Sequence, residues 1–284
     1  MGVTSRLVKF NEPSPKKRFG QHFLRDRGVI DRIVRWIQPG SNDLFLDIGA
    51  GDGALSLHLA PEVPHLLAIE IDADCIPHLE NALASFPSAT VIAGDILNLD
   101  LAELVSPYLK PDTRLRIAGN LPYNISTVII EKLLRVDLPI YDLAFMVQLE
   151  VAQRITARPG TKDYGYFSLI CQHHSDVRLG FKVSPACFVP RPKVSSAMVS
   201  FRLKPKKWDS ALESDFEAMG KAAFSYRRKT LENSLSRHPV LGKRSSLLLA
   251  RAGINGARRA EELSVLEYEH LAQTYHTLPM TGDE

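Results

Sequence analysis

The chain has 284 residues, of which 45% are hydrophobic and 24% are charged, and its formal net charge is +3. This length and composition favour a globular protein with a major domain and a smaller attached one over a single large domain. They exclude a protein built on membrane-spanning helices, because no apolar run approaches the roughly 20 residues that such a helix needs.

The N-terminus and the cysteines further restrict the class of protein that this chain can be. Lys9 and Lys16 precede no apolar segment, which is not typical of a secretory signal, so we expect a cytoplasmic protein with no membrane partner. Cys75, Cys171 and Cys187 lie far apart and form no C-x-x-C pair. They indicate neither a disulfide framework nor a zinc site, and we predict no bound metal.

Charge is strongly segregated along the chain. Residues 1–35 carry nine Lys and Arg against three Asp and Glu, residues 40–112 carry one against twelve, and residues 185–259 carry sixteen against five. Two basic segments that flank an acidic one predict a polyanion bound by the arms around a centre that prefers a cationic ligand. The alternative is that these charges only cover solvent-exposed helix surfaces. Such surfaces usually alternate positive and negative residues and do not separate them into long segments.

Hydrophobic periodicity predicts that helices and strands alternate over most of the chain. Helices are expected around residues 29–37, 54–60 and 126–134, from about 150, and after 163–167. Strands are expected over residues 44–48, 66–72, 90–95, a run ending at 120, 143–148, 177–183 and 194–203. This alternation is typical of a doubly wound α/β sheet.

The first expected strand leads into Gly49-Ala50-Gly51-Asp52-Gly53, which is typical of a nucleotide-binding turn. Glycines permit a tight bend and close approach of a ligand, and the next helix offers free N–H groups. The second strand ends in Glu70, placed to accept hydrogen bonds from ribose hydroxyls. The third ends in Asp95, which can accept from an adenine amino group or simply cap a helix. Both NAD and S-adenosylmethionine fit this pattern.

The fourth strand ends at the open edge of the predicted sheet in Asn120-Leu121-Pro122-Tyr123. Pro122 fixes its own φ and keeps Leu121 out of the helical region, so the carbonyls here point outward. The Asn120 side-chain oxygen and the Leu121 carbonyl can hold an exocyclic amine, and the Tyr123 ring offers a face for stacking a planar base. The alternative is a plain strand-to-helix turn with an N-terminal proline.

Two later features bear on the same site. The loop over 185–192 contains three prolines and carries Phe188, which can form a second aromatic wall opposite Tyr123 or serve as a packing anchor. Beyond residue 209 the pattern is helical. The cationic run Arg227-Arg228-Lys229 in this part can neutralise phosphates.

Together these blocks resemble the small-subunit ribosomal RNA adenine dimethyltransferases of the KsgA type. The matching stretches follow the family's order: Lys17-Arg18-Phe19-Gly20-Gln21-His22-Phe23-Leu24, Asp47-Ile48-Gly49-Ala50-Gly51, Glu70-Ile71-Asp72, Gly94-Asp95, Gly119-Asn120-Leu121-Pro122-Tyr123-Asn124-Ile125-Ser126, Phe188-Val189-Pro190-Arg191-Pro192-Lys193-Val194 and Ala223-Phe224-Ser225-Tyr226-Arg227-Arg228-Lys229-Thr230. Several are weak individually, but jointly they are highly specific. The family often has Asn where His22 stands, Asp where Ser195 stands and Gln where Tyr226 stands.

The resemblance implies a Rossmann-like S-adenosylmethionine-dependent methyltransferase domain over residues 16–205 and a small helical, RNA-contacting domain over 206–284. A disordered arm is expected over 1–15. The implied cofactor pocket is lined by His22, Leu24, Gly49, Gly51, Glu70, Asp95 and Asn120. The implied catalytic residues are Asn120, Leu121, Tyr123 and Phe188. Contacts with RNA are expected from Lys16, Lys17, Arg18, Arg191, Lys193, Arg227, Arg228 and Lys229.

The implied reaction transfers methyl groups to the N6 amine of two adjacent adenines in the 3′-terminal hairpin loop of 16S ribosomal RNA. The expected substrate is a pre-assembled small ribosomal subunit, and the expected enzyme is a monomer. An NAD-dependent oxidoreductase fits the glycine turn but leaves the Asn120-Leu121-Pro122-Tyr123 end unexplained. A large-subunit methyltransferase that confers antibiotic resistance shares the catalytic motifs, but the C-terminal helical domain with Arg227-Arg228-Lys229 argues for the small-subunit enzyme. A role as a ribosome-assembly checkpoint can coexist with catalysis.

Overall fold

The structure is a computed structural model that describes Lys16, residues 20–226 and residues 228–278. Its strands are β1 (Phe23–Leu24), β2 (Asp43–Ile48), β3 (His65–Glu70), β4 (Ala89–Ala93), β5 (Arg114–Asn120), β6 (Ile140–Gln148), β7 (Ser175–Val183), β8 (Phe188–Val189) and β9 (Ser196–Leu203). Its α-helices are α1 (Arg27–Ile37), α2 (Ser56–Leu59), α3 (Ile76–Leu83), α4 (Leu101–Val105), α5 (Ser126–Arg135), α6 (Leu149–Ile155), α7 (Tyr166–His174), α8 (Ser210–Phe224), α9 (Leu231–Leu235), α10 (Ser245–Arg251) and α11 (Val265–Thr277). In the described part of the chain, no helix has the length and apolar character needed to cross a membrane.

Seven strands form one sheet in the order β4-β3-β2-β5-β6-β9-β7. The pairs β3–β4, β2–β3, β2–β5 and β5–β6 are parallel. From β2 the chain builds the sheet toward β4, and it then returns to the other side of β2 with β5. The carboxyl ends of β2 and β5 therefore flank the point where sheets of this type bind ligands. The predicted doubly wound α/β fold is confirmed.

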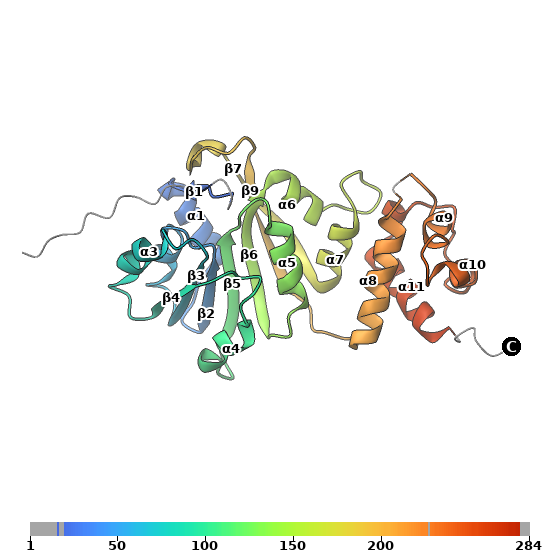
Figure 1. The fold of residues 1–284 in the computed structure, drawn as a ribbon, viewed down its shortest axis with the longest axis horizontal. Helices are drawn as coiled ribbons and strands as arrows, with labels where there is room; N and C mark the ends of the chain where they lie inside the picture. The colour runs from blue at the N-terminus through green and yellow to red at the C-terminus, as the bar shows by residue number, and fades with distance from the viewer. Residues whose placement is uncertain (1–15, 17–19, 227, 279–284) are drawn as a thin grey trace, which may run out of the picture. The chain divides into compact units, whose positions relative to one another are not determined.

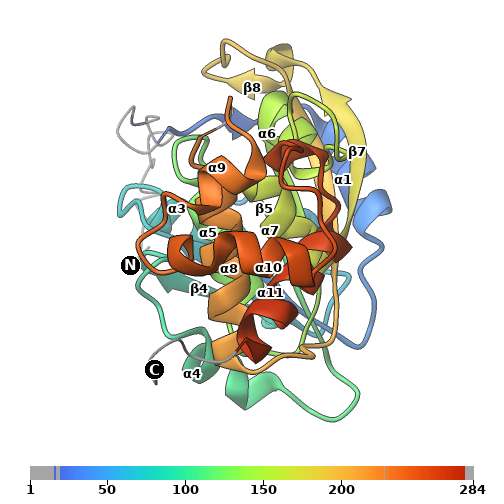
Figure 2. The same ribbon diagram turned by 90° about the vertical axis from the view of Figure 1, so that its right-hand side faces the viewer.

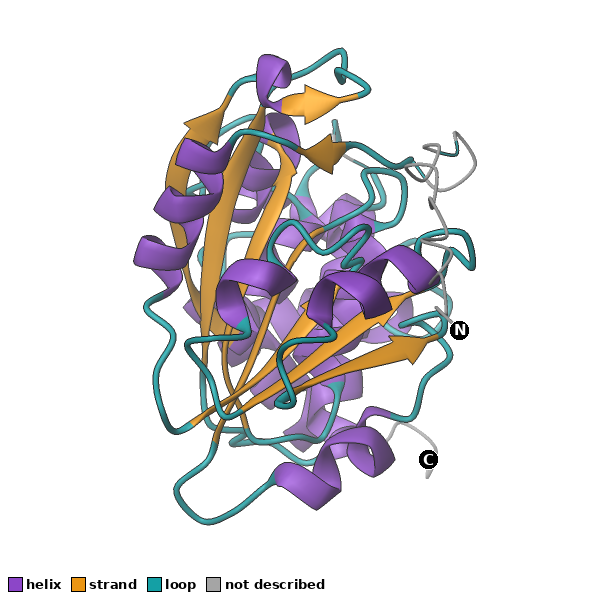
Figure 3. Ribbon diagram, turned by 90° about the vertical axis from the view of Figure 1, so that its left-hand side faces the viewer, coloured by secondary structure: helices purple, strands orange, loops and turns teal. Residues whose placement is uncertain are grey.

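Helices cover both faces of the parallel strands. Figure 1 shows α1 and α5 on opposite sides of β2 and β5, and Figure 3 shows helices in front of and behind the strands. One face packs against α1, α2 and α3 in a core that includes Ile33, Phe45 and Leu79. Leu44 and Leu46 alternate with Phe45 and are also fully buried. The central strand β2 is thus buried on both faces, as expected in a parallel sheet.

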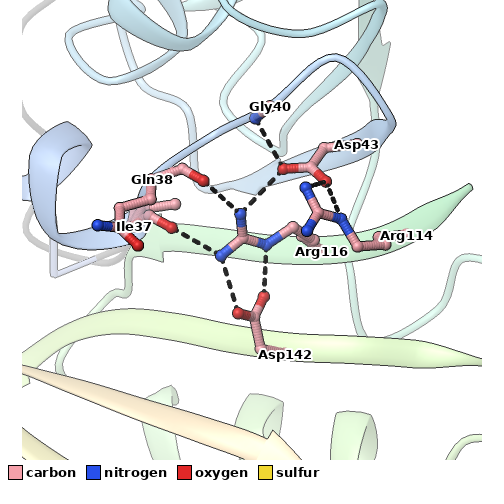
Figure 4. A network of polar contacts seen from close by, with 7 residues as sticks. All are labelled: Ile37, Gln38, Gly40, Asp43, Arg114, Arg116 and Asp142. Atoms are coloured by element: carbon pink, nitrogen blue, oxygen red, sulfur yellow. Dashed lines mark hydrogen bonds and ion pairs between the residues drawn. The ribbon is translucent and has the colours of Figure 1, made fainter.

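Arg116 fastens the amino-terminal ends of three strands to helix α1 (Figure 4). Its Nε and one Nη donate to Asp142 of β6 at 2.7 and 2.8 Å, and its other Nη donates to Asp43 of β2 at 2.9 Å. The remaining two N–H groups donate to the carbonyls of Ile37 and Gln38, at 2.7 and 2.9 Å, where α1 ends. All five donors of this buried guanidinium are therefore used. The network holds β2 and β5 together at the end opposite the ligand-binding edge.

The chain divides into two compact units, residues 1–149 with 180–200 and residues 150–179 with 201–284. The bounds fall inside β7 and β9, and unit 1 contains β2 to β6 with their helices. The division at residue 205 expected from sequence has different bounds and stays a prediction. The arm over 1–15 that we expect to be disordered lies outside the described residues.

Unit 2 contains the helices α8 to α11, which are drawn in orange and red in Figure 2. His173 at the end of α7 joins two of them, because its ring nitrogens contact Glu269 of α11 at 2.8 Å and Glu213 of α8 at 3.3 Å. The ring also stacks on Phe216, with 4.0 Å between centroids. Burial opposes protonation of this histidine, but the two carboxylates outweigh it and raise the pKa of His173.

Candidate active site

A cleft in unit 1 opens at the carboxyl ends of β2, β3 and β5. Its cavity, of about 80 Å³, is lined by the predicted residues His22, Leu24, Gly49, Gly51, Glu70, Asn120, Leu121 and Tyr123. A second cavity of about 240 Å³, at the end of β4, is lined by Asp95 and shares Gly49, Ile71 and Pro122 with the first. Six of the seven residues predicted to bind the cofactor therefore line the first cavity, and Asp95 lines the second, which shares lining residues with the first.

The glycine turn after β2 has the backbone that its sequence predicts. Gly49 and Gly51 have φ values of +70° and +60°, in the left-handed region that glycine adopts without strain. A Cβ atom on Gly51 would lie 3.1 Å from the Phe23 ring. The N–H of Gly49 donates to the carbonyl of Ile69 at 2.9 Å, which ties the turn to β3. Glycine is needed here for conformation and for space.

Glu70 is held rigidly at the end of β3. Its Oε2 accepts from the N–H of Gly51 at 2.7 Å, and its Oε1 accepts from the N–H groups of Ile71 and Asp72 at 2.9 and 2.8 Å. Burial raises the pKa of this carboxyl group, although the three N–H groups act in the opposite direction. The carboxylate is thus oriented by one backbone donor of the glycine turn and two that follow β3.

A second acid, Asp47, lies beneath the turn and is almost fully buried. Ser56 at the start of α2 donates its hydroxyl to Asp47 Oδ2 at 2.6 Å. Burial raises the pKa of Asp47 to about 7; the Ser56 bond opposes this rise and the charge of Glu70 adds to it. The floor of the cleft therefore contains two carboxyl groups, and a cationic ligand would favour their ionised forms.

The N-terminal segment, defined here as Lys16 with residues 20–25, is fastened across the strand ends. The Lys16 ammonium contacts Asp72 at 2.5 Å and Asp74 at 2.6 Å. Gln21 donates its side-chain N–H to Asp72 at 3.0 Å and accepts from the Lys16 N–H at 2.8 Å. Burial opposes ionisation of Asp72, but these donors lower its pKa overall. We call Lys16, Gln21 and Asp72 the clasp.

Two further links hold the same segment. Arg25 forms an ion pair with Asp52 of the glycine turn. The side-chain N–H of Asn120 donates to the carbonyl of His22 at 2.8 Å. The segment is therefore attached to the residues that follow β2 and β3 and to the end of β5, and it forms one wall of the cleft.

The contact with His22 fixes the direction of the Asn120 amide. With Nδ2 committed to that carbonyl, Oδ1 is the side-chain acceptor that remains, and no hydrogen bond among the described residues engages it. Leu121 donates its N–H to the carbonyl of Met146 on β6 at 3.1 Å. The end of β5 thus presents an oriented acceptor on a backbone that is anchored to the neighbouring strand.

The Tyr123 ring is also held in place. Its hydroxyl pairs with Ser196 Oγ at 2.5 Å, and its ring lies 5.1 Å from the His22 ring, tilted by 31°. Burial raises the pKa of the phenol, while the Ser196 contact opposes this rise. Phe188 does not line the cleft, because it pairs with Leu24 in the β1–β8 ribbon and is 2% exposed. Its role as a second wall of the base clamp stays a prediction.

The cations predicted to contact RNA fall into three groups. Lys17, Arg18 and Arg227 lie outside the described residues. Lys16 is engaged in the clasp. The remaining four, which are exposed, are Arg191 and Lys193 of unit 1 and Arg228 and Lys229 of unit 2. The exposed side chains are available to a polyanion, and their contact with RNA stays a prediction.

Several residues that shape the cleft had no assigned role in the sequence interpretation. Gln21 and Asp72 lie within the motifs described above, so the sequence predicts that both are near a bound ligand. It does not predict that they contact each other. Ser196 lies next to the motif residues of the 188–194 stretch and gives no signal of its own.

The strand order and the cleft at the carboxyl ends of β2 to β5 define a Rossmann-like α/β fold. Solved structures share this fold: a dimethyladenosine transferase from Plasmodium falciparum has a TM-score of 0.77 and 22% identity, covering 90% of this chain and 98% of its own. The 23S rRNA methyltransferase ErmE has a TM-score of 0.66 and 24% identity, covering 90% of this chain and all of its own.

Sequence comparison identifies the family. The model of the family described as "Ribosomal RNA adenine dimethylase" matches residues 13–277. Proteins named ribosomal RNA small subunit methyltransferase A are similar, with 41% identity over 263 residues for those of Geobacter sulfurreducens (91% of this chain, 94% of the relative) and of Legionella pneumophila strain Philadelphia 1 (92% and 97%). The chain belongs to the ribosomal RNA adenine dimethylase family.

Proposed function

We propose that the protein uses S-adenosylmethionine to convert two adjacent adenines of small-subunit ribosomal RNA to N6,N6-dimethyladenosine. Membership of the family and the names of its relatives support this reaction. The observation that carries it is the presence of Asn120 and Leu121 in the same cleft as Glu70 and the glycine turn. By this proposal, a site for an exocyclic amine and a site for a nucleoside-containing cofactor would lie side by side.

The residues present fit S-adenosylmethionine. Glu70, oriented by three backbone N–H groups, would accept hydrogen bonds from the ribose hydroxyls. Asp95 would accept from the adenine amino group at the edge of an apolar cavity that contains Ile71 and Ile129. The missing side chain at Gly51 leaves room for the Phe23 ring, which lines the cleft beside the glycine turn. When bound, this cofactor supplies a methyl group on a positively charged sulfur.

On the other side of the cleft, Asn120 Oδ1 and the Leu121 carbonyl would hold the N6 amine of an adenine taken out of its stack. The Tyr123 ring would support the base. As the nitrogen bonds to the methyl carbon and the bond from that carbon to sulfur breaks, with S-adenosylhomocysteine as the leaving group, the nitrogen would gain positive charge. The two oxygens would stabilise this charge before the proton leaves to solvent. No strong base is needed, because most of the rate comes from positioning. A second transfer to the same nitrogen gives the dimethylated product.

The substrate, by the same proposal, is the 3′-terminal hairpin loop of 16S ribosomal RNA in a pre-assembled small subunit, and the enzyme acts as a cytoplasmic monomer. The methyltransferase domain would span residues 16–205 and the helical domain 206–284. The four exposed cations Arg191, Lys193, Arg228 and Lys229 would contribute phosphate contacts, so RNA affinity would fall with salt.

The test uses small ribosomal subunits that lack the modification. They are incubated with the protein and S-adenosylmethionine, the RNA is digested, and methylated adenosines are quantified by mass spectrometry. We expect dimethyladenosine near the 3′ end with the wild type, and none with Asn120→Ala, which should still bind the subunit. Tight binding without transfer would favour an assembly factor, and transfer only to large-subunit RNA would favour the resistance-type enzyme.

A further inference from the structure

Helix α5 begins shortly after the Asn120-Leu121-Pro122-Tyr123 stretch and carries an unusual lysine contact. The Lys132 ammonium donates to the backbone carbonyls of Ile96 and Leu97, each at 2.9 Å, and to that of Leu99 at 3.2 Å. An ammonium has three N–H donors and no acceptor, so these bonds use its full donor capacity. The three carbonyls belong to the loop that follows β4, defined here as residues 94–99.

This loop is also closed on itself through Asp95. The N–H of Leu97 donates to Asp95 Oδ1 at 2.9 Å, and the side chain of Asn98 donates to Oδ2 at 3.0 Å. The Asp95 carbonyl accepts from the N–H groups of Asn98 and Leu99 at 2.8 and 3.0 Å. The backbone donors thus turn inward to Asp95, while the later carbonyls turn toward Lys132. Each carbonyl would need another partner if the ammonium were removed.

The loop forms one side of the cavity of about 240 Å³ described above. Gly94, Asp95, Ile96 and Leu97 line it, and Ile129 of α5 lines it from the other side. Because residues three apart on a helix lie on the same face, Ile129 and Lys132 project from α5 in similar directions. Helix α5 therefore lines the cavity with Ile129. One turn later it carries Lys132, whose ammonium holds the 94–99 loop on the other side of the cavity. Lys132 itself does not line the cavity.

We infer that Lys132 is a positioning residue for the cofactor's adenine end. It holds the 94–99 loop so that Asp95 and the apolar side chains keep the shape that an adenine ring requires. Since α5 also follows directly from the end of β5, the same helix connects the cofactor end of the cleft to the residues proposed to hold the target base. This inference rests on the proposed use of S-adenosylmethionine and adds a residue that no motif of the sequence contains.

The test measures binding of S-adenosylhomocysteine to the purified full chain by calorimetry. Lys132→Met should weaken binding by about 10-fold or more, because the loop loses three charge-assisted bonds. Lys132→Arg should restore most of the affinity, and Lys132→Gln, with two N–H donors, should lie between. The control is Lys110→Met, which removes an exposed ammonium of the same unit and should leave the affinity unchanged.

Hydrogen exchange and kinetics separate this role from a general loss of stability. In Lys132→Met, amides of residues 94–99 should exchange faster, and S-adenosylhomocysteine should protect them less. On small subunits, the KM for S-adenosylmethionine should rise while kcat at saturation changes little. Equal affinity and exchange in wild type and Lys132→Met would overturn the inference. Failure of the wild type to bind S-adenosylhomocysteine would instead overturn the proposed function.

Discussion

The side-chain N–H of Asn120 donates to the backbone carbonyl of His22 at 2.8 Å, across 98 positions of sequence. The Asn120 amide has a donor end and an acceptor end. Because this bond uses the donor end, the acceptor oxygen is the end that faces the cleft. The bond also makes the orientation of the residue at the end of β5 dependent on the N-terminal segment.

Asn120→Asp should lower the single-turnover rate of methyl transfer by about 100-fold or more. A carboxylate has no N–H for the His22 carbonyl, so two oxygens would face each other and the side chain would rotate away. The measurement is a single-turnover assay on unmodified small subunits with saturating S-adenosylmethionine. Asn81→Asp is the matched control, because it makes the same change at an exposed position of helix α3; its rate should stay within about threefold of wild type. Similar losses in both variants would contradict this account.

Asp72→Asn should loosen the N-terminal segment. The change removes the charge that pairs with Lys16 and turns one oxygen that accepts from Lys16 or Gln21 into a donor. We expect weaker binding of S-adenosylhomocysteine and faster tryptic cleavage within the first 25 residues. Asp74→Asn is the control, since Asp74 is 63% exposed and its ion pair with Lys16 is worth little. If both variants behave like wild type, the clasp does not shape the cleft.

Stability should depend on pH through Asp47. Its pKa is about 7 in the folded protein, above its ordinary value of 3.8, so the folded state binds more protons than the unfolded state between these values. The contribution of Asp47 is fully present below pH 4 and is lost as pH rises to 7, a loss of up to about 4 kcal/mol. Asp47→Asn should therefore gain stability relative to wild type as pH rises. Urea unfolding at pH 5 and pH 8 gives the free energy of unfolding of each variant, and Asp112→Asn, at an exposed position, is the control. If this free energy changed equally with pH in wild type and in Asp47→Asn, the prediction would be wrong.

Arg116→Met should reduce the free energy of unfolding by about 3–5 kcal/mol, because Asp43 and Asp142 would lose a buried partner. Arg114→Met removes a guanidinium from the same carboxylate, Asp43, but Arg114 is 40% exposed. Its loss should cost about 1 kcal/mol or less. Urea denaturation of the two variants tests the difference. If both variants lost the same free energy of unfolding, the hydrogen-bond network around Arg116 would stabilise the protein no more than a surface ion pair does.

Much of the fold was readable in the sequence because its signals are local. The apolar run over residues 44–48 and the glycines after it predict a buried strand and a turn with positive φ, and both are present in β2 and at Gly49 and Gly51. Parallel strands bring their carboxyl ends to one edge, so Glu70 and Asn120 could be expected to meet.

The direction of Phe188 was not readable. A proline-rich loop predicts stiffness, but pairing of β8 with β1 turns Phe188 inward against Leu24 and leaves Val189 54% exposed. Side chains alternate along a strand, so the register of this short ribbon decides which of the two residues faces the cleft or the core. No local pattern specifies that register.

The sequence by itself determined the main strands of the sheet, the glycine turn and the position of Asn120 at a strand end, because periodicity and backbone preference act between near neighbours. Three hydrogen bonds are determined only by the tertiary structure. They join Gln21 to Asp72 within the clasp, Tyr123 to Ser196, and Lys132 to the 94–99 loop. These contacts join residues 51, 73 and 36 positions apart. They form because packing brings a donor to a particular acceptor, and that pairing is set by three-dimensional position and not by residue type.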